Sequence, residues 1–453
     1  MSSEKVSAFP GPPSSSTFPV KGSESGKAVY VENHGCAANR FDFEVMLALL
    51  ARAGNRLTRR AGEADIIFMN TCGVKKPTED RMIERLRFLR RLGKPIIIAG
   101  CLPRINSDAI IEAVPDYSAM LDPQSVDKVL LALKAAERSE KNRIFFSQKS
   151  PLKLDLPKMR LNRCVEIVPI SEGCSGACAF CCVRFARGTL FSYPKEAIVR
   201  RVGEAVAEGA KEVWITSQDA GSYGLDTQTS LAEMLSECCK VEGKFLIRVG
   251  MMNPDQVLRM LPEMIDAYKD EKIFKFLHLP VQSGDNEVLR RMNRRYAVEE
   301  FKAIVDSFRK AMPEITLATD VICGFPGESE EAFGGTLRLI EEAHPDVVNI
   351  SKFFPRLNTP AERMRQIPVD EVKNRSLKLT RLVREMFSKR NQRWLNWEGE
   401  ILVDERGKGA SWIGRNFAYR PIVVKSREDL LGKFMRVKVV KAYRTYLEAV
   451  LTG

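Results

Sequence analysis

The chain contains 453 residues, 44% of them hydrophobic, with 11 cysteines and a formal net charge of +13 at pH 7. This length exceeds that of one ordinary domain, and the apolar content is sufficient for several cores. The lack of any run of about eighteen apolar residues argues against a membrane-spanning helix. An odd number of scattered cysteines argues against a disulfide framework and favours reduced thiols or metal ligands, so we expect a cytoplasmic protein.

Residues 1–26 are rich in Ser, Pro and Gly, with neither a basic start nor an apolar stretch, so we predict a disordered leader. In residues 27–145, apolar strands alternate with amphipathic helices, which predicts a parallel sheet covered on both faces. Cys36, Cys72 and Cys101 each follow the C-terminal end of a predicted strand. Open α/β sheets build their sites in those loops, so we expect the three thiols to converge, although a buried cysteine can also be a simple hydrophobe.

A second alternating series, residues 160–390, contains six predicted strands separated by helices, which indicates a partial or complete (β/α) barrel. After its first strand, the stretch EGCSGACAFCCVRFARG (172–188) places Cys174, Cys178 and Cys181 in a C-x3-C-x2-C pattern. Zinc sites usually pair their cysteines as C-x2-C and close at four ligands. Three thiolates instead suit a [4Fe–4S] cube whose fourth iron stays open.

Polar residues are predicted at or just beyond the later strands of this barrel. The candidates are Ser217, Asp219, Arg248, His278 and Gln282. Because such barrels place their chemistry at the C-terminal ends of the strands, we expect these residues to line one pocket. Two structural alternatives stay open, an ion pair for Arg248 and a hydrogen-bonded strand end for His278. Gly324 and Gly327 are expected to let the backbone approach a ligand, and Asn39 to cap a helix.

The last part of the chain, residues 391–453, alternates apolar and polar residues with Gly-rich turns, which predicts a small all-β barrel. From Arg356 onward the chain has 22 basic and 11 acidic residues, whereas the preceding 355 residues have 49 and 47. The aromatic residues of this region include Trp412, Phe417, Tyr419 and Tyr443. A basic module with aromatic side chains is suited to RNA, through phosphate contacts and base stacking.

The C-x3-C-x2-C motif, with the aromatic Phe180 before its third cysteine and a barrel behind it, resembles the radical S-adenosylmethionine enzymes. Five stretches are similar to a narrower group, the methylthiotransferases of that superfamily: HGCAANRFD, NTCGV, AGCLPR, HLPVQSGDNEVLRRMNR and TDVICGFPGE. The resemblance covers residues 28–453 and includes a final barrel similar to the TRAM RNA-binding domain. Within the group, ISEGCSGACAFCCVRFARG, TSQDAGSYG and VGMMNP look most like the archaeal and eukaryotic branch.

This resemblance implies an α/β fold made of an N-terminal parallel-sheet domain, a central radical S-adenosylmethionine partial barrel and a TRAM barrel. It implies S-adenosylmethionine and two [4Fe–4S] clusters as cofactors. The auxiliary cluster would be held by Cys36, Cys72 and Cys101, and the radical-generating one by Cys174, Cys178 and Cys181. The cofactor and substrate pocket would be lined by Phe180, Ser217, Asp219, Arg248, His278 and Gln282.

The implied reaction converts N6-threonylcarbamoyladenosine 37 of tRNA into its 2-methylthio derivative by radical C–H activation and sulfur insertion. The implied partners are tRNA, an electron donor such as ferredoxin or flavodoxin, and a sulfur source. Alternative targets are isopentenyl-modified adenosine in tRNA or an aspartate of a ribosomal protein. Two other classes remain, an RNA-binding or electron-transfer protein with inert clusters and a zinc-binding structural protein, although neither cysteine set supplies the four ligands that zinc takes.

Overall fold

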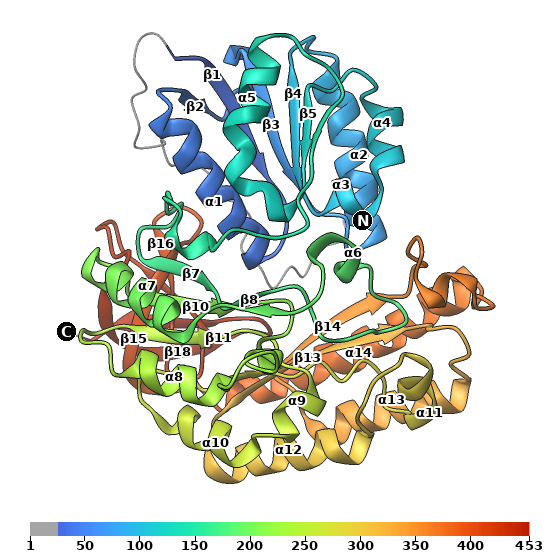
Figure 1. Ribbon diagram of the computed structural model, residues 1–453. Helices are drawn as coiled ribbons and strands as arrows, with labels where there is room; N and C mark the ends of the chain where they lie inside the picture. The colour runs from blue at the N-terminus through green and yellow to red at the C-terminus, as the bar shows by residue number, and fades with distance from the viewer. Residues whose placement is uncertain (1–25, 453) are drawn as a thin grey trace.

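The computed structural model describes residues 26–452, which form three units that follow one another along the chain (Figure 1). The predicted leader, residues 1–26, lies outside the described residues except for Gly26. Within the described part of the chain, no helix is both long and apolar enough to cross a membrane.

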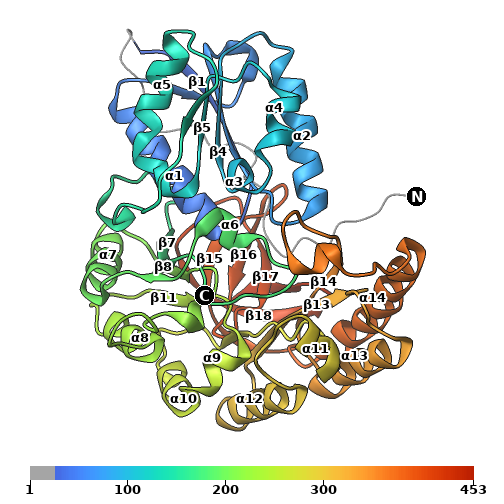
Figure 2. The ribbon, with the colours of Figure 1, turned by 45° about the vertical axis from the view of Figure 1, so that its right-hand side comes forward.

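The first unit is a parallel sheet with the strand order β2-β1-β3-β4-β5-β6. Its strands are β1 (Ala28–Asn33), β2 (Arg56–Thr58), β3 (Ile66–Thr71), β4 (Ile96–Gly100), β5 (Ala119–Leu121) and β6 (Arg143–Phe145). Its helices are α1 (Ala37–Arg52), α2 (Lys76–Arg90), α3 (Leu102–Ile105), α4 (Ser107–Ala113) and α5 (Val129–Glu137). Helices α1 and α5 cover one face and α2 and α4 the other (Figures 1 and 2), which confirms the predicted sheet.

The second unit has six parallel strands in two sheets, with the orders β7-β10-β11 and β12-β13-β14. These strands are β7 (Val165–Pro169), β10 (Glu212–Thr216), β11 (Leu246–Val249), β12 (Phe276–His278), β13 (Thr316–Cys323) and β14 (Val347–Lys352). A bridge between Ile247 and Ile273 joins the two sheets. Because β7 and β14 are the outer strands, the barrel is open between them, as the predicted partial barrel requires.

Helices cover the outside of this barrel, and a short hairpin follows β7 (Figures 1 and 2). The hairpin strands are β8 (Ser171–Glu172) and β9 (Phe191–Ser192). The helices are α6 (Val183–Arg187), α7 (Lys195–Ala207), α8 (Leu231–Cys239), α9 (Pro254–Leu258), α10 (Leu261–Lys269), α11 (Asn286–Arg291), α12 (Val298–Ala311) and α13 (Glu330–Ala343).

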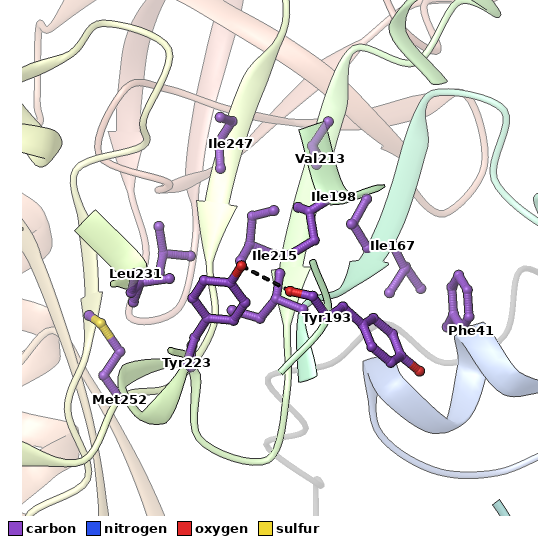
Figure 3. Close-up of a cluster of buried hydrophobic side chains, with 14 of the residues drawn as sticks. Phe41, Ile167, Tyr193, Ile198, Val213, Ile215, Tyr223, Leu231, Ile247 and Met252 are labelled. Atoms are coloured by element: carbon purple, nitrogen blue, oxygen red, sulfur yellow. Dashed lines mark hydrogen bonds between the residues drawn. The ribbon is translucent and has the colours of Figure 1, made fainter. Parts of the chain in front are cut away.

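The first two units share one hydrophobic core, because α1 lies against the barrel. Phe41 of α1 is buried beside Ile167 of β7 (Figure 3). Within the same cluster, the Tyr223 hydroxyl donates a hydrogen bond of 3.0 Å to the carbonyl of Tyr193. This continuous packing fixes the edge of the sheet over one end of the barrel, the end at which the barrel strands finish (Figure 1).

The third unit is a closed five-stranded barrel in the order β15-β16-β17-β19-β18, as predicted. Its strands are β15 (Glu398–Arg406), β16 (Ser411–Arg415), β17 (Pro421–Lys425), β18 (Phe434–Ala442) and β19 (Leu447–Leu451). The basic helix that leads to it is α14 (Val369–Gln392), and Trp394 after that helix is buried in the core of the small barrel.

A loop of the small barrel closes the N-terminal end of the large one. The carbonyl of Phe417 accepts a hydrogen bond of 2.7 Å from the Lys275 backbone N–H. The carbonyl of Ala418 accepts one of 2.6 Å from the Thr316 hydroxyl. Tyr419 donates 3.0 Å to Glu212, the first residue of β10. Tyr419 is therefore bound within the protein, and the opposite end of the barrel is where a site can open.

Candidate active site

The C-x3-C-x2-C motif, with Cys174, Cys178 and Cys181, lies in the loop between β8 and α6. Gly173, which precedes the motif, has φ of +68°, and a Cβ there would lie 2.0 Å from the carbonyl oxygen of Thr189. The position therefore requires glycine. The loop then turns tightly, with the Cys181 N–H donating 3.1 Å to the Cys178 carbonyl. The local geometry thus brings the three thiols to the mouth of the barrel, beyond the end of β7.

Hydrogen-bond donors surround the sulfurs of this first set. The Gly176 N–H donates a hydrogen bond of 3.3 Å to the Cys174 Sγ, and Arg294 Nη1 donates one of 3.2 Å to the Cys178 Sγ. Burial raises the pKa of Cys174 to about 11 and raises the pKa of Cys181 as well. Cys174 and Cys181 therefore hold their protons when no metal is bound, so binding a cluster releases protons. The Arg294 guanidinium offers a charged donor to the third sulfur, that of Cys178.

The second cysteine set lies at the edge of the six-stranded sheet. Cys36 follows β1 at the start of α1, Cys72 follows β3, and Cys101 lies between β4 and α3. Burial, together with the charges of Cys101 and Cys36, raises the pKa of Cys72 to about 12. The pKa of Cys101 is raised to about 11, again mainly by burial. Because β1, β3 and β4 are neighbouring parallel strands, the three cysteines that follow them lie at one edge of the sheet, as predicted.

Both sets fit the donor chemistry of an iron–sulfur cube. All cysteines of the described chain are free thiols, and each set brings three of them together. Among residues 26–452, no three His, Cys, Asp or Glu side chains are close enough to share a single metal ion. A cube takes one thiolate at each of three corner irons, and each set supplies three free thiols for them.

Asp219, one of the predicted pocket residues, is buried in a network beside the first cysteine set. Its carboxylate accepts a hydrogen bond of 2.7 Å from the Ser222 hydroxyl and one of 2.6 Å from Asn253 Nδ2. The Ser222 hydroxyl is 2.8 Å from that of Ser175, inside the cysteine loop. Burial raises the pKa of Asp219. Ser217 accepts 3.1 Å from the Asp219 N–H, so both residues shape the loop at the end of β10, and their contact with a cofactor stays a prediction.

Arg248 has a different environment from the ion pair that was its structural alternative. Its guanidinium carbon lies 5.5 Å from the Trp214 ring centroid, 5.1 Å from Phe276 and 5.3 Å from Tyr419. Its Nε is buried without a hydrogen-bond partner. The side chain thus sits inside the barrel among three aromatic rings, held by cation–π attraction.

His278 and Gln282 lie near the C-terminal end of β12, as predicted. His278 Nε2 is 2.6 Å from Asp320 Oδ2 of β13, and this contact lowers the pKa of Asp320 despite its burial. Gln282 has φ of +67°, an uncommon conformation for a residue with a side chain. Its N–H donates 2.8 Å to the Asp320 carbonyl. The His278–Asp320 contact ties the end of β12 to β13.

Phe180 and the two glycines serve packing in the described structure. Phe180 meets the edge of Phe325 with ring centroids 6.4 Å apart, which anchors the cysteine loop to the loop after β13. A Cβ at Gly324 would lie 2.4 Å from the Val372 side chain of α14, and one at Gly327 would collide with Arg291. Both glycines have positive φ, so these contacts and the turn itself account for them.

Sequence reasoning also misplaced or missed several residues. Asn39 does not cap α1, because Cys36 holds the cap position and Asn39 lies inside the helix. Its side-chain amide instead donates hydrogen bonds of 2.6 Å to the His34 carbonyl and 3.2 Å to the Thr71 carbonyl. These bonds tie the loop of Cys36 to the loop of Cys72. Arg294 was missed because only a basic run, RRMNRR, marks it in the sequence. Its contact with the cysteine loop joins residues more than a hundred positions apart.

The fold and the C-x3-C-x2-C loop define a radical S-adenosylmethionine enzyme. Residues 168–340 match the Radical SAM superfamily, residues 28–122 the Uncharacterized protein family UPF0004, and residues 398–452 the TRAM domain. Among solved structures, the chain resembles a radical S-adenosylmethionine methyltransferase, TsrM from Kitasatospora setae, with a TM-score of 0.55 and 13% identity. That match covers 74% of this chain and 77% of the other, and it supports the fold.

Curated relatives narrow the class. A probable threonylcarbamoyladenosine tRNA methylthiotransferase of Pyrococcus horikoshii is 44% identical over 421 residues, which cover 92% of this chain and 98% of the relative. The human threonylcarbamoyladenosine tRNA methylthiotransferase is 33% identical over 448 residues, covering 96% of this chain and 75% of the relative. The chain belongs to the threonylcarbamoyladenosine tRNA methylthiotransferase family. Its cofactors are S-adenosylmethionine and two [4Fe–4S] clusters, as predicted.

Proposed function

We propose that this protein converts N6-threonylcarbamoyladenosine 37 of tRNA into its 2-methylthio derivative. The observation that carries this proposal is the presence of two separate three-cysteine sets at one interface, one at the edge of the sheet and one at the mouth of the barrel. One cluster alone would suffice for radical generation. A second set with room for an open iron is what sulfur insertion needs.

In this proposal Cys174, Cys178 and Cys181 hold the cluster that supplies an electron to S-adenosylmethionine. A radical is required because the C–H bond at C2 of adenine is too inert for acid–base attack. Arg294 donates a hydrogen bond to the Cys178 sulfur, and the network around Asp219 holds the cysteine loop in place. The remaining candidates at the barrel mouth, His278 and Gln282, are available to the substrate base.

The auxiliary cluster is assigned to Cys36, Cys72 and Cys101. Its chemistry is the delivery of sulfur to the activated carbon. Burial under the sheet edge keeps water from the buried member of this set, Cys101, which is 4% exposed. An electron donor such as ferredoxin or flavodoxin and a separate sulfur source complete the reaction in the cytoplasm.

The basic TRAM barrel supplies the tRNA-binding surface in this proposal. The excess of positive charge from Arg356 onward supports it, since phosphate contacts dominate affinity for nucleic acids. The relatives' names favour threonylcarbamoyladenosine over the isopentenyl-modified adenosine or ribosomal-protein aspartate considered as alternatives.

The test uses the anaerobically reconstituted full chain with tRNA that carries the threonylcarbamoyl group, S-adenosylmethionine, sulfide and a chemical reductant. Digestion of the tRNA and mass spectrometry should reveal the 2-methylthio nucleoside together with 5′-deoxyadenosine. A parallel reaction contains tRNA with isopentenyladenosine, and a third contains unmodified tRNA. Product from the isopentenyl substrate alone would contradict the proposed target, and 5′-deoxyadenosine without any methylthio product would contradict the proposed reaction.

A further inference from the structure

The segment of residues 356–361, which follows β14, contacts both cysteine loops, and we call it the bridging segment. Its first residue, Arg356, is 4% exposed, and its last residue, Ala361, is fully buried. Between them the Arg356 carbonyl accepts hydrogen bonds from the Thr359 N–H at 3.1 Å and from the Thr359 hydroxyl at 2.7 Å. The bridging segment thus has two buried ends joined by a hydrogen-bonded turn.

The first end of the bridging segment holds the loop of Cys72. The guanidinium of Arg356 donates hydrogen bonds to the carbonyl of Gly73, the residue directly after Cys72, and to the carboxylate of Glu79 on α2. A Cβ at Gly73 would lie 2.8 Å from the side chain of Leu102, the first residue of α3. The backbone beside Cys72 is therefore in close contact both with Arg356 and with α3.

Glu79 extends this contact to the loop of Cys101. It is 2% exposed, and its Oε1 accepts a hydrogen bond of 2.9 Å from Asn106 Nδ2. Asn106 ends α3, which begins directly after Cys101, and its side chain caps α4. The buried chain of contacts from Arg356 through Glu79 to Asn106 therefore links the barrel to two of the three loops of the second cysteine set.

The other end of the bridging segment holds the loop of the first cysteine set. The Ala361 N–H donates a hydrogen bond of 2.9 Å to the carbonyl of Ala179, which lies between Cys178 and Cys181. Ala179 and Ala361 also pack in one buried hydrophobic cluster. One short segment therefore holds the backbone directly after Cys178 at one end and the backbone directly after Cys72 at the other.

A buried thiol makes a second contact between the two loops. Cys182, directly after Cys181, is fully buried, and its Sγ donates a hydrogen bond of 3.7 Å to the carbonyl of Val74. Val74 follows Cys72 by two residues. The loop of Cys72 is thus held to the barrel domain at two neighbouring carbonyls, one by Arg356 and one by Cys182.

We propose that Arg356 is a positioning residue that fixes the loop of Cys72 relative to the loop of Cys178, so that radical formation is followed by sulfur insertion at the same carbon. This inference rests on the proposed function, in which the two cysteine sets act on one adenosine. The hydrogen bonds of Arg356 go to a backbone carbonyl and a carboxylate, so it acts through the position of the loop. Such positioning matters because a misplacement of about 1 Å can cost about a hundredfold in rate.

The experiment measures the ratio of methylthio nucleoside to 5′-deoxyadenosine formed by the anaerobically reconstituted full chain. In Arg356→Met this ratio should fall at least about tenfold, whereas the iron content and the amount of 5′-deoxyadenosine should stay close to those of the wild type. Arg356→Lys restores one charged donor, so its ratio should lie between those of Arg356→Met and the wild type.

Hydrogen–deuterium exchange of the same reconstituted proteins reports the position of the loop without relying on activity. In Arg356→Met the backbone amides of residues 72–78 should exchange about tenfold faster than in the wild type, because a loop that loses its contacts opens locally. Arg363→Met is the matched control, since Arg363 lies just beyond the bridging segment but is exposed. It should leave both the product ratio and the exchange unchanged.

If Arg356→Met does not retain its clusters, the double variant Glu79→Gln, Arg356→Met removes the carboxylate charge that the single change leaves behind, and it should show the same lowered ratio and faster exchange.

The outcomes separate this inference from the function on which it rests. A wild type that forms no methylthio nucleoside would overturn the proposed function, and the exchange measurement would still decide whether Arg356 holds the loop. A wild type that forms the product, with an unchanged ratio and unchanged exchange in Arg356→Met or in the double variant, would overturn the role of Arg356 and leave the function standing.

Discussion

Each cysteine set has one arginine that supports it. Arg294 donates to the Cys178 sulfur. Arg187 is paired with Asp42 and Glu172 and donates to Asn39, the residue that holds the loops of Cys36 and Cys72. A guanidinium is always charged and offers several donors, so it can stabilise a thiolate without titrating itself. The two arginines differ in their origin, because Arg294 comes from the barrel whereas Arg187 comes from the opposite cysteine loop. That difference makes the auxiliary set dependent on the docking of the barrel.

The first prediction at the residue scale separates the roles of the two sets. Cys178→Ala should abolish 5′-deoxyadenosine formation, because S-adenosylmethionine cleavage needs a complete radical-generating cluster. Cys72→Ala should spare that product and stop formation of the methylthio nucleoside. Both products are measured in one reaction by mass spectrometry. Cys239→Ala, a free cysteine on α8 outside both sets, should retain both, and loss of 5′-deoxyadenosine in Cys72→Ala would contradict the division of roles.

A second prediction concerns the buried ion pairs that Lys153 makes between the first unit and the large barrel. Lys153 is fully buried between Asp42 and Glu172. Lys153→Met should lower the free energy of unfolding by about 3–5 kcal/mol, since it leaves two carboxylates without one of their cations. Denaturant unfolding followed by circular dichroism measures the loss. Lys149→Met, at an exposed position on the same linker, is the control, and equal effects of the two substitutions would contradict the account.

The elements show how much of the fold could be predicted. Apolar strands alternating with helices revealed β1, β3, β4 and all six barrel strands. The three-residue strand β12 was found because it stands within the longer apolar stretch FKFLHLPV, residues 274–281. Strands β2, β5 and β6 were missed, since three residues carry no periodicity. The contact of the loop at Tyr419 with the large barrel could not be predicted either. It depends on which polar groups meet across some two hundred residues of chain.

The candidate site divides in the same way. The cysteines were visible because the spacing of the motif and the repeated strand-end positions are local signals. The roles of Asn39 and Arg187 were not visible, because both act through contacts between separate domains. Asn39 stands where a helix cap was expected, and local sequence could not show that its Nδ2 donates to two backbone carbonyls while its Oδ1 accepts from Arg187.

At the scale of elements, the loop that closes the barrel should make stability depend on pH. Glu212 of β10 accepts from Trp214 Nε1 and the Tyr419 hydroxyl, yet burial, with the nearby charge of Asp404, raises its pKa from 4.5 to about 8. Between these values the unfolded chain releases the proton and the folded chain keeps it. The contribution of Glu212 to stability is therefore present below pH 4.5 and lost as the pH rises towards 8.

Glu212→Gln keeps the shape and stays neutral, so it should remove this dependence. Apparent unfolding midpoints are measured at a fixed scan rate at pH 5 and at pH 8. The midpoint of the wild type should fall between these pH values, and the midpoint of Glu212→Gln should fall less. Glu242→Gln, at an exposed position, should follow the wild type. A decline of equal slope in Glu212→Gln would show that this carboxyl does not titrate within the barrel.

For the whole molecule, the position of the small barrel decides how tRNA binding should be tested. Deleting residues 399–453 would also remove the contacts of Tyr419 and the core around Trp394, so a truncated chain would confuse binding with folding. Surface changes are cleaner. The turn between β18 and β19 presents stacked tyrosines, Tyr443 and Tyr446, with ring centroids 4.6 Å apart, and Asn391 of α14 holds this turn by its carbonyls.

Lys441 and Arg444 are exposed beside this tyrosine pair. The variant Lys441→Ala, Arg444→Ala should weaken tRNA binding and lower the slope of log K against log salt by about 0.7 for each cation removed. Filter binding at several salt concentrations measures both quantities. Lys269→Ala, Lys310→Ala on the outer helices α10 and α12 is the control, and an unchanged slope in the first variant would remove this turn from the tRNA-binding surface.

The measurement that tests the central claim most directly is iron and sulfide content after anaerobic reconstitution. The claim is that the two cysteine sets hold two independent clusters at one interface. Wild type should contain about eight irons, and the variants with Ala at either set of three cysteines should each contain about four. About four irons in the wild type, falling to none when Cys174, Cys178 and Cys181 are changed to Ala, would contradict the claim and leave sulfur insertion without its cluster.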